Sequence, residues 1–382
     1  MKKILFGAGK YGKYALLKYG RENVAYFVDN NVTRVGNRID GIEIISFARF
    51  LEIYRDFEIV ISTQYVKEVE NQLNRQGIYH YTNFKTDKWC YYPTNELIVN
   101  PYEMDEGIDN DYIDTSGIAV TNKINAINNQ VDELYGTDHL FDHVEIETVN
   151  RCNGGCSFCP VSVKNDTREF KKMEEELFYK IINELERLSY SGRLALFSNN
   201  EPFLDERIIK FHQYARERLP RARMHLFTNG TLLTVERFVQ IMEYLDELVI
   251  DNYHQELKLI GPCRKIKAYC EEHPQLKSKV TIVLRKVDEV LTTRGGDAPN
   301  ARLVSYPGAK CVLPYRQLII RPDGKVSLCC NDALGRNTLG DVSKDSVLDV
   351  WNNDRFRMVR ECLHRGRSEW KHCQHCDFFS VG

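Results

Sequence analysis

The sequence lacks any long apolar segment and any strong excess of charge of one sign. No stretch approaches the ~20 apolar residues of a membrane helix, so we expect no membrane span. The N-terminal segment MKKILFGAGKYG has only a few apolar residues before its first glycine, which is too few for the apolar core of a signal peptide. We therefore expect a cytoplasmic location. The formal net charge of −2 gives no overall field that would select nucleic acid or an anionic membrane. Internal repeats are not evident, and 382 residues are enough for two or three domains.

Cysteine, by contrast, is abundant and unevenly placed. Of the twelve cysteines, three fall between residues 152 and 159 and six lie in the last 72 residues. In a reducing compartment, clustered cysteines are more often metal ligands than disulfides. Cys90, Cys263 and Cys270 stand apart from these groups, and we interpret them as small hydrophobic residues.

The first 85 residues alternate strand and helix patterns. Strands are predicted at residues 4–6, 24–28, 42–45 and 58–62, with helices ending near residue 19 and covering 47–55 and 66–76. This order predicts a small parallel α/β domain of the Rossmann kind over residues 1–85. Residues 86–140 are rich in Asn, Asp and Tyr, and we interpret them as a linker with a helix near 121–135.

A G-x-G-x-x-G segment, made by Gly7, Gly9 and Gly12, joins the first strand to the first helix. Its backbone N–H groups can hold a phosphate, and Asp29 is placed to accept a hydrogen bond from a ribose hydroxyl. The alternative is that the glycines only make a tight turn. We favour a nucleotide or nucleotide-sugar as the ligand, although the domain is short for an NAD enzyme. The segment resembles small Rossmann-like domains attached to enzymes of cell-surface glycan assembly.

A second alternation of strands and helices begins near residue 141. Strands are predicted at residues 144–148, 194–198, 224–227, 247–250 and 280–284, with helical stretches between them that include 173–188, 205–218 and 234–244. The pattern predicts an α/β fold with a parallel sheet or partial barrel over residues 141–305, whose active site lies at the C-terminal ends of the strands. The loop with the first cysteine group follows the first of these strands and therefore lies at such an end.

That loop contains Cys152, Cys156 and Cys159. The Asn-Gly-Gly insert and Pro160 argue against a helix and favour a loop that curls around an ion cluster. A [4Fe–4S] cluster takes four ligands, so three thiolates leave one iron open, as in a catalytic metal site with a vacant position. Zinc is the alternative, but zinc sites usually pair C-x₂-C with a distant second pair.

The spacing Cys152-x₃-Cys156-x₂-Cys159 after a strand, with Phe158 before the last cysteine, resembles the radical S-adenosylmethionine (SAM) superfamily. The resemblance covers some 240 residues, from residue 143 onward. It implies a partial (β/α)6 barrel in which the open iron chelates SAM. It also implies reductive cleavage of SAM to a 5′-deoxyadenosyl radical that abstracts a substrate hydrogen atom. A flavodoxin or ferredoxin would supply the electron.

A second element supports the resemblance. The segment 198–202, Ser-Asn-Asn-Glu-Pro, corresponds to the family's Gly-Gly-Glu-Pro stretch, which binds the methionine amino group. Asn199 and Asn200 replace the glycines, whereas Glu201 is retained and could accept from an ammonium. Asn229, in the Thr-Asn-Gly turn after the next strand, is expected to shape the cofactor pocket.

Two further cations follow a later strand. Lys286 and Arg294, with the Gly295-Gly296 turn, could meet a carboxylate of the substrate or cofactor. A surface loop is the equally weighted alternative.

The C-terminal region, residues 306–382, contains a second cysteine pattern. Gly324-x₄-Cys329 predicts a hairpin that presents a thiolate. Together with Cys311, Cys373 and Cys376 it gives four ligands, which close the coordination of a second, auxiliary [4Fe–4S] cluster. The arrangement resembles the twitch form of the SPASM extension of radical enzymes. A four-cysteine zinc site is the alternative.

The remaining residues of this region have more than one interpretation. Cys330 adjoins a predicted ligand and is either a spare thiol or a hydrogen-atom donor, and Cys362 is similarly ambiguous. Trp351, Phe356 and Met358 are predicted to face the core from an amphipathic helix.

Three functions are compatible with these patterns. A fully thiolate-bound auxiliary cluster has no open iron and suits electron transfer, which favours an oxidoreductase that dehydrogenates a sugar, cyclitol or related small molecule. Epimerisation of such a substrate and modification of a peptide are alternatives within the radical enzymes. The non-catalytic alternative is a zinc-containing nucleotide-binding protein.

Overall fold

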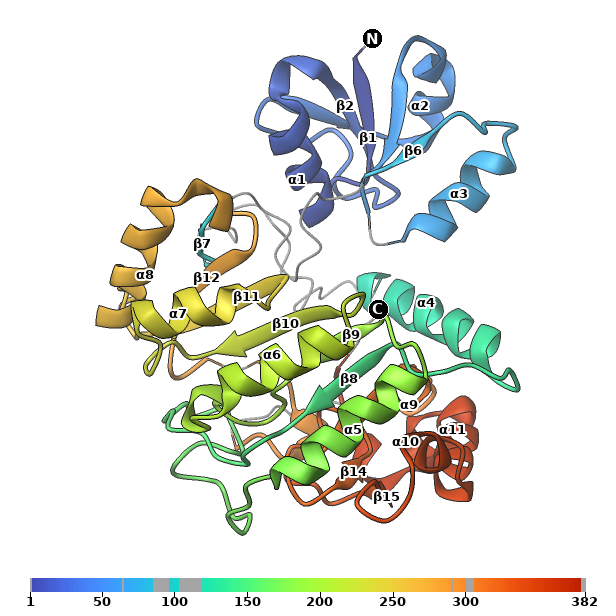
Figure 1. Cartoon of the computed structure of the whole chain (residues 1–382). Coiled ribbons are helices and arrows are strands. Elements are labelled where there is room, and N and C mark those ends of the chain that lie inside the picture. The colour runs from blue at the N-terminus through green and yellow to red at the C-terminus, as the bar shows by residue number, and fades with distance from the viewer. Residues whose placement is uncertain are drawn as a thin grey trace. The chain divides into compact units, whose positions relative to one another are not determined.

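The chain folds into two compact units, which we describe separately. The computed structural model describes residues 2–63, 65–84, 96–102, 118–289, 291–299 and 306–378 (Figure 1). The first unit is built from Met1–Asn95 and Tyr102–Ser116, and the second from Glu96–Pro101 and Gly117–Gly382. No helix in these described stretches is both long enough and apolar enough to cross a membrane.

The described part of the first unit is a three-layer α/β structure. Its six strands are ordered β3-β4-β2-β1-β5-β6 and run parallel except for β3. The strands are β1 (Lys3–Phe6), β2 (Val24–Val28), β3 (Arg38–Ile39), β4 (Ile42–Ile45), β5 (Glu58–Ile61) and β6 (Thr82–Asn83). The helices are α1 (Lys10–Tyr19), α2 (Phe47–Ile53) and α3 (Val66–Asn74).

The two faces of this sheet are buried under different helices. Leu16 of α1 packs with Leu5 and Phe27 on one face, whereas Phe50 of α2 and Leu73 of α3 belong to the core on the other face. The sequence predicted each of the four longer strands and the three helices. It missed β3 and β6, because two-residue strands carry no periodic signal.

The second unit is built on one larger sheet. Its nine described strands are ordered β15-β14-β13-β8-β9-β10-β11-β12-β7. They are β7 (Ile98–Val99), β8 (His143–Ile146), β9 (Arg193–Ala195), β10 (Arg223–Thr228), β11 (Glu247–Tyr253), β12 (Val280–Arg285), β13 (Gln317–Ile320), β14 (Lys325–Ser327) and β15 (Thr338–Asp341). From β13 across to β7 the neighbours are parallel, and β14 and β15 add an antiparallel edge.

Helices cover one face of this sheet (Figure 1). The described helices of the unit are α4 (Ile118–Leu134), α5 (Glu175–Arg187), α6 (Ile208–Arg218), α7 (Val235–Met242), α8 (Gly261–Glu272), α9 (Leu313–Arg316), α10 (Val347–Trp351) and α11 (Asp354–Arg365). Phe178 of α5, Phe211 of α6, Phe238 of α7 and Ile266 of α8 lie in one core with the strands. This is the parallel α/β arrangement that the sequence predicted.

The opposite face of the sheet is polar although it is buried. Along β8, Val144 and Ile146 belong to the core beneath the helices, whereas His143 and Glu145 alternate with them and are each 6% exposed. Gln317 at the start of β13 is likewise only 9% exposed. Because alternate side chains of a strand point to opposite faces, these polar groups share the face away from the helices. A parallel sheet is usually apolar on both faces, so this polar face marks the interior as a site.

Two elements add detail to the sequence-based expectations, and one residue needs correction. Residues 86–140, interpreted as a linker with some structure of its own, include β7, which pairs with β12 through Ile98 opposite Ile282. The helix α8 is one of the helical stretches expected between the strands, although its bounds were not predicted. Met358 is 48% exposed and not part of the core, whereas Trp351 and Phe356 are fully buried as predicted. Met358 lies on the outer side of α11, whose mixed composition hides which face is inward.

Of the isolated cysteines, two have the environment that was expected. Cys263 and Cys270 of α8 are 1% and 0% exposed, so they behave as small hydrophobic residues. Cys90 lies outside the described residues.

Candidate active site

The first cysteine group lies in an irregular loop directly after β8. The backbone N–H of Gly154 donates to Cys152 Sγ at 3.2 Å. A Cβ on Gly154 would stand 3.3 Å from Cys152 Sγ and 3.8 Å from Cys156 Sγ, so both thiols gather on the same side of this glycine. After burial, the negative charge of Cys159 contributes to the raised pKa of Cys152 and of Cys156, as expected if the third thiol lies near the other two.

These thiols are suited to a cationic cluster rather than to nucleophilic chemistry. Burial raises the pKa of Cys152 to about 11 and that of Cys156 to about 12. Each therefore stays protonated at neutral pH unless a cation replaces the proton. The N–H of Gly154 donates to the sulfur, and Asn229 Nδ2 lies 3.8 Å from Cys152 Sγ, which are the contacts that support a cluster thiolate. The loop fits an iron–sulfur cluster.

Glu201 lies in the loop after β9, and its carboxylate accepts hydrogen bonds from the end of β10. Its Oε1 accepts from Thr228 Oγ1 at 2.7 Å and from the N–H of Phe203 at 3.1 Å, and its Oε2 accepts from the N–H of Asn229 at 2.8 Å. The side chain is 1% exposed, and burial raises its pKa while these donors oppose the rise. A carboxylate has about four acceptor sites, so Oε2 keeps a lone pair for the predicted ammonium.

Asn199 and Asn200, which replace two glycines of the family pattern, are both engaged. Asn200 Oδ1 accepts from the N–H of Ser198 at 3.0 Å, while its buried Nδ2 has no partner among the described residues. Asn199 Nδ2 donates to the carbonyl of Cys330 at 3.1 Å. A buried amide without a partner is costly, so a ligand atom at Asn200 Nδ2 would stabilise the site.

Two other predicted cofactor residues border the cysteine loop. Asn229 Nδ2 donates to Asn153 Oδ1 at 2.8 Å, which ties the turn after β10 to the loop. Phe158 is 7% exposed, and its ring centroid lies 5.9 Å from that of Tyr253 at the end of β11. The loop is thus bordered by the C-terminal ends of β10 and β11.

A group of polar side chains lies on the interior face beside this loop. Glu145 Oε2 accepts from Ser198 Oγ at 2.6 Å, and burial raises the pKa of Glu145 to about 7 while the positive charges of Arg193 and Arg294 oppose the rise. Arg294 Nη1 lies 3.4 Å from Asn199 Oδ1 and donates to the carbonyl of Cys330 at 3.3 Å. The Glu145 carboxyl and the Arg294 guanidinium therefore contact two successive residues, Ser198 and Asn199.

Cys330 belongs to the same group. Its thiol pKa is raised, first by burial and then by the charge of Glu145, while Arg294 lowers it. Arg294 also donates to the carbonyl of Cys330, and Cys330 interacts with the neighbouring Cys329. Sequence reasoning found Cys330 and weighed Arg294, but it missed Glu145. The available signal was the alternation of His143 and Glu145 with apolar residues inside a buried strand.

Arg168 connects the loop after the cysteines with the segment 198–202. Its Nη2 donates to the carbonyls of Asn150 and Asn199, each at 3.0 Å. Asp166 accepts from Nε and Nη2 of the same guanidinium at 3.0 Å. The side chain of Arg168 is 9% exposed. Nothing in the local sequence pattern indicated this role.

The C-terminal cysteines form a second group. The charges of Cys311, Cys373 and Cys376 each raise the pKa of the buried Cys329 thiol, after burial itself, so the four thiols lie close together. Cys329 follows β14 of the hairpin that the sequence predicted. Within the described ranges, no three His, Cys, Asp or Glu side chains converge closely enough to hold a single metal ion.

The glycine-rich loop of the first unit is explained largely by its own packing. A Cβ on Gly12 would lie 2.0 Å from the carbonyl oxygen of Gly7, and one on Gly7 would lie 2.7 Å from that of Ser62. Asp29 Oδ2 accepts from the N–H of Ala8 at 2.9 Å and Oδ1 from that of Asn31 at 2.8 Å. Gly9 is open, because a Cβ there would have only the Arg34 guanidinium within 4 Å.

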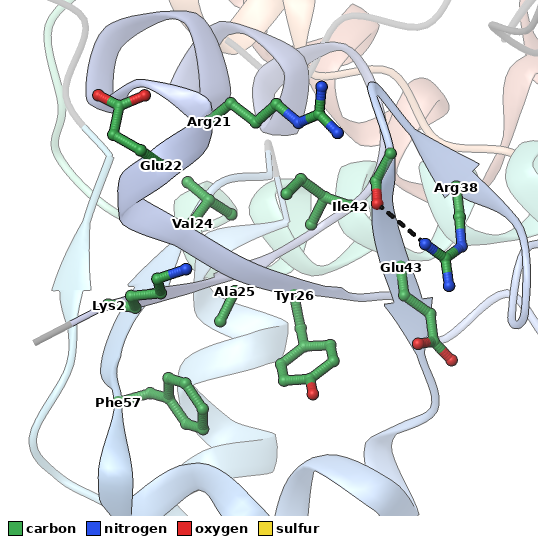
Figure 2. A pocket seen from close by; sticks show the side chains of 11 residues that line it. Lys2, Arg21, Glu22, Val24, Ala25, Tyr26, Arg38, Ile42, Glu43 and Phe57 are labelled. Atoms are coloured by element: carbon green, nitrogen blue, oxygen red, sulfur yellow. Dashed lines mark hydrogen bonds between the residues drawn. The ribbon is translucent and has the colours of Figure 1, made fainter.

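A cavity of about 620 Å³ lies elsewhere in this unit. Figure 2 shows Tyr26 and Phe57 along it, with Arg21 on the far side and Arg38 donating to the carbonyl of Gly41. Because its lining includes Val24, the first residue of β2, the cavity lies at the N-terminal edge of the sheet. The predicted nucleotide site is at the opposite edge.

The fold and the two cysteine groups define a radical SAM enzyme. The radical SAM superfamily model matches residues 146–258, and the SPASM model, an iron–sulfur cluster-binding domain, matches residues 311–377. The chain is therefore a radical SAM enzyme with a SPASM-type C-terminal domain. Its cofactors are [4Fe–4S] clusters and SAM, and it is an oxidoreductase.

One curated protein and two solved structures are similar to a large part of this chain. The S-adenosyl-L-methionine-dependent 2-deoxy-scyllo-inosamine dehydrogenase of Niallia circulans is 28% identical over 247 residues, which are 64% of this chain and 96% of the relative. The crystal structure of BtrN in complex with AdoMet and 2-DOIA aligns with a TM-score of 0.56 and 27% identity, covering 64% of this chain and 96% of that one. BtrN in an open conformation aligns with a TM-score of 0.48 and 22% identity over 63% of this chain and 94% of that one.

Proposed function

We propose that the enzyme oxidises an alcohol carbon of a cyclitol, amino-cyclitol or related sugar-derived molecule to a carbonyl. The observation that carries this proposal is the buried Glu145 carboxyl, hydrogen-bonded to Ser198 at 2.6 Å, next to Asn199, whose Oδ1 lies 3.4 Å from Arg294 Nη1. A carboxyl with a pKa of about 7 can accept a hydroxyl proton at physiological pH. The name of the relative from Niallia circulans, a dehydrogenase of 2-deoxy-scyllo-inosamine, supports this substrate class.

Each residue of the interior group has a role in the proposal. Glu145 takes the proton of the substrate hydroxyl, and Ser198 holds the carboxyl in place through its 2.6 Å hydrogen bond. Arg294 orients the substrate oxygens with its guanidinium. Bound clusters and SAM supply hydrogen-atom abstraction from the carbon and acceptance of the remaining electron.

The residues that hold these cofactors are proposed from the cysteine groups and their surroundings. Ligands of the catalytic cluster would be Cys152, Cys156 and Cys159, and ligands of the auxiliary cluster would be Cys311, Cys329, Cys373 and Cys376. SAM would contact Phe158, Asn199, Asn200, Glu201 and Asn229. A flavodoxin or ferredoxin would deliver the electron that starts the reaction.

The proposal is tested with anaerobically reconstituted enzyme, dithionite and SAM. The substrates are 2-deoxy-scyllo-inosamine and scyllo-inositol, with a cysteine-containing peptide as the competing class. We expect a ketone from at least one cyclitol, with one 5′-deoxyadenosine formed for each ketone. Glu145→Gln should lose ketone formation while keeping both clusters. Turnover of the peptide, with no ketone from either cyclitol, would contradict the proposal.

Epimerisation is the second candidate, and one observation favours it. Arg294 donates to the carbonyl of Cys330 at 3.3 Å, so a thiol-bearing residue adjoins the guanidinium proposed to orient the substrate, where a hydrogen atom would have to be returned. In that reaction Cys330 would be the catalytic donor. Retention of the hydroxyl with inversion at its carbon would distinguish epimerisation from oxidation.

For the first unit, the proposal is a nucleotide or nucleotide-sugar bound at Gly7, Gly9, Gly12 and Asp29. Support comes from the open position of Gly9 at the start of α1, beside the Arg34 guanidinium. Titration calorimetry of the full chain against UDP-sugars and NAD tests it, with Gly9→Val as the blocked variant. Equal heats from both proteins would leave the loop as a tight turn only.

A further inference from the structure

Arg294 is held in an unusual backbone conformation. The φ angles of Arg294, Gly295 and Gly296 are +49°, +64° and +95°, so three successive residues lie in the left-handed region. Glycine adopts this region readily, whereas an arginine does so only where surrounding contacts impose it. The result is that the Arg294 side chain reaches the interior face, where it contacts Asn199 and the carbonyl of Cys330.

The contacts that fix this turn come from the end of the chain. The N–H of Thr293 donates to Asp377 Oδ1 at 2.8 Å. Thr293 Oγ1 lies 2.7 Å from the carbonyl oxygen of His375 and 2.9 Å from Asp377 Oδ1, and the N–H of Asp377 lies 3.3 Å from this hydroxyl. Thr293 is 1% exposed, so water does not compete for these bonds.

Gly295, which follows Arg294, also packs against the segment 372–377. A Cβ on Gly295 would come within 2.4 Å of His372 Nε2, so the turn passes directly against the His372 ring. Residues 372–377 also carry Cys373 and Cys376, two proposed ligands of the auxiliary cluster. One short segment therefore contacts the turn of Arg294 and contributes half of the auxiliary ligand set.

We propose that Thr293 and Asp377 are positioning residues that set Arg294 in the substrate site, so that the ordered auxiliary-cluster segment is required for substrate recognition as well as for electron transfer. This inference rests on the proposed function, in which Arg294 orients the substrate. Neither residue touches the substrate. Both act by holding the backbone of residue 294 in its left-handed conformation.

The test is a double-mutant cycle on the anaerobic holoenzyme with 2-deoxy-scyllo-inosamine as the probe. Thr293→Val keeps the shape but removes the hydroxyl, and it should raise KM roughly fivefold, the effect of one lost hydrogen bond. In an Arg294→Ala background the same change should have no further effect, because the positioned group is gone. Thr293→Ser keeps the hydroxyl, so its KM should equal that of the wild type. The iron content should be the same in all of these variants.

The matched control is Ser343→Ala. Ser343 donates its N–H and its hydroxyl to Asp341 Oδ1, as Thr293 does to Asp377, but in the turn after β15 away from the interior group. This variant should leave KM unchanged. Additive effects of Thr293→Val and Arg294→Ala, or equal KM values for Thr293→Val and wild type, would overturn the inference.

A measurement without substrate separates this inference from the proposed function. Amide hydrogen exchange at residues 293–297 should rise in Thr293→Val and in Asp377→Ala, and not in Asp377→Asn, whose Oδ1 still accepts. If the wild type oxidises no cyclitol while exchange rises as expected, the proposed function is wrong and the positioning contact stands. Unchanged exchange in both disruptive variants contradicts the positioning role whatever the substrate.

Discussion

Arg168 donates to both carboxylate oxygens of Glu147, with Nη1 3.2 Å from Oε1 and 3.3 Å from Oε2. Burial raises the pKa of Glu147 to about 7, and the charge and hydrogen bonds of Arg168 oppose that rise. The same guanidinium binds the carbonyls of Asn150 and Asn199, so it fixes the entry to the cysteine loop relative to the segment proposed to bind SAM. Breaking a buried pair of this kind leaves an uncompensated charge.

The first prediction is that Arg168→Gln weakens SAM binding while the iron content is retained. The Kd for SAM should rise by at least about tenfold, since the Asn199 carbonyl and Glu147 lose their donor. Arg168→Lys keeps the charge but not the planar fork, so it should be intermediate. Equilibrium dialysis with labelled SAM provides the measurement.

Arg207 offers a matched control. It forms the same Asp-x-Arg contact, with Nε 2.9 Å and Nη2 2.8 Å from the two oxygens of Asp205, but within the described part of the chain it has no hydrogen bond to a loop of the site. Arg207→Gln should leave SAM affinity unchanged. If both variants weaken SAM binding equally, a general loss of stability explains the effect and the positioning role of Arg168 is wrong.

The contrast between Arg168 and the cysteines shows what the sequence could and could not predict. Cys152, Cys156 and Cys159 signal themselves by spacing within one loop, and the strands and helices by local periodicity. Arg168 acts on Asn199, 31 residues away, and no local pattern encodes that contact. Glu145 lies between these cases, because its alternation with apolar residues was visible but was not used.

The second prediction concerns pH. If Glu145 accepts the substrate proton, kcat should rise with pH through about 7 and level off above it. Glu145→Gln should abolish the rate. Arg294→Gln should move the inflection to higher pH, because the positive charge of Arg294 lowers the pKa of Glu145. The measurement is the pH profile of steady-state ketone formation at saturating substrate.

Stability supplies a check that does not depend on turnover. The folded pKa of Glu145, about 7, lies above the ordinary value of 4.5, so its stabilising contribution is complete below 4.5 and is lost as pH rises to about 7. As the pH rises from 5 to 8, the free energy of unfolding of Glu145→Gln should increase relative to that of the wild type by up to roughly 3 kcal/mol. Glu147→Gln distinguishes the two carboxyls: if it alone removes the kinetic inflection, Glu145 is not the base.

The third prediction is that Cys152, Cys156 and Cys159 hold the catalytic cluster. Replacing all three by Ala should remove roughly half of the iron and abolish SAM cleavage under dithionite, because these thiolates are its only proposed protein ligands. Cys263→Ala and Cys270→Ala are controls from the buried face of α8. SAM cleavage that survives the triple change would contradict the assignment.

The fourth prediction is that the auxiliary cluster persists in that triple variant. Its electron paramagnetic resonance spectrum after reduction should still show a [4Fe–4S] signal from the group of Cys311, Cys329, Cys373 and Cys376. Further replacement of Cys373 and Cys376 should remove that signal, whereas Cys362→Ala should not. Zinc in place of iron in the triple variant would favour a structural zinc site for this group.

The last prediction separates oxidation from epimerisation by isotope. Oxidation removes a hydrogen atom from the carbon, a proton from its hydroxyl and one further electron, which leaves a carbonyl with no hydrogen at that carbon. In deuterated water the ketone should therefore contain no deuterium at the oxidised position. An epimerase would return a hydrogen atom from a thiol, and the Cys330 thiol exchanges with solvent, so the inverted carbon would gain one deuterium. Mass spectrometry and NMR of the product distinguish the two outcomes.

Cys330→Ser should leave ketone formation intact, because the hydroxyl fits the space of the thiol and the oxidation needs no thiol. Deuterium at an inverted centre that disappears with Cys330→Ser would overturn the dehydrogenase proposal, while the assignments of both cysteine groups would stand.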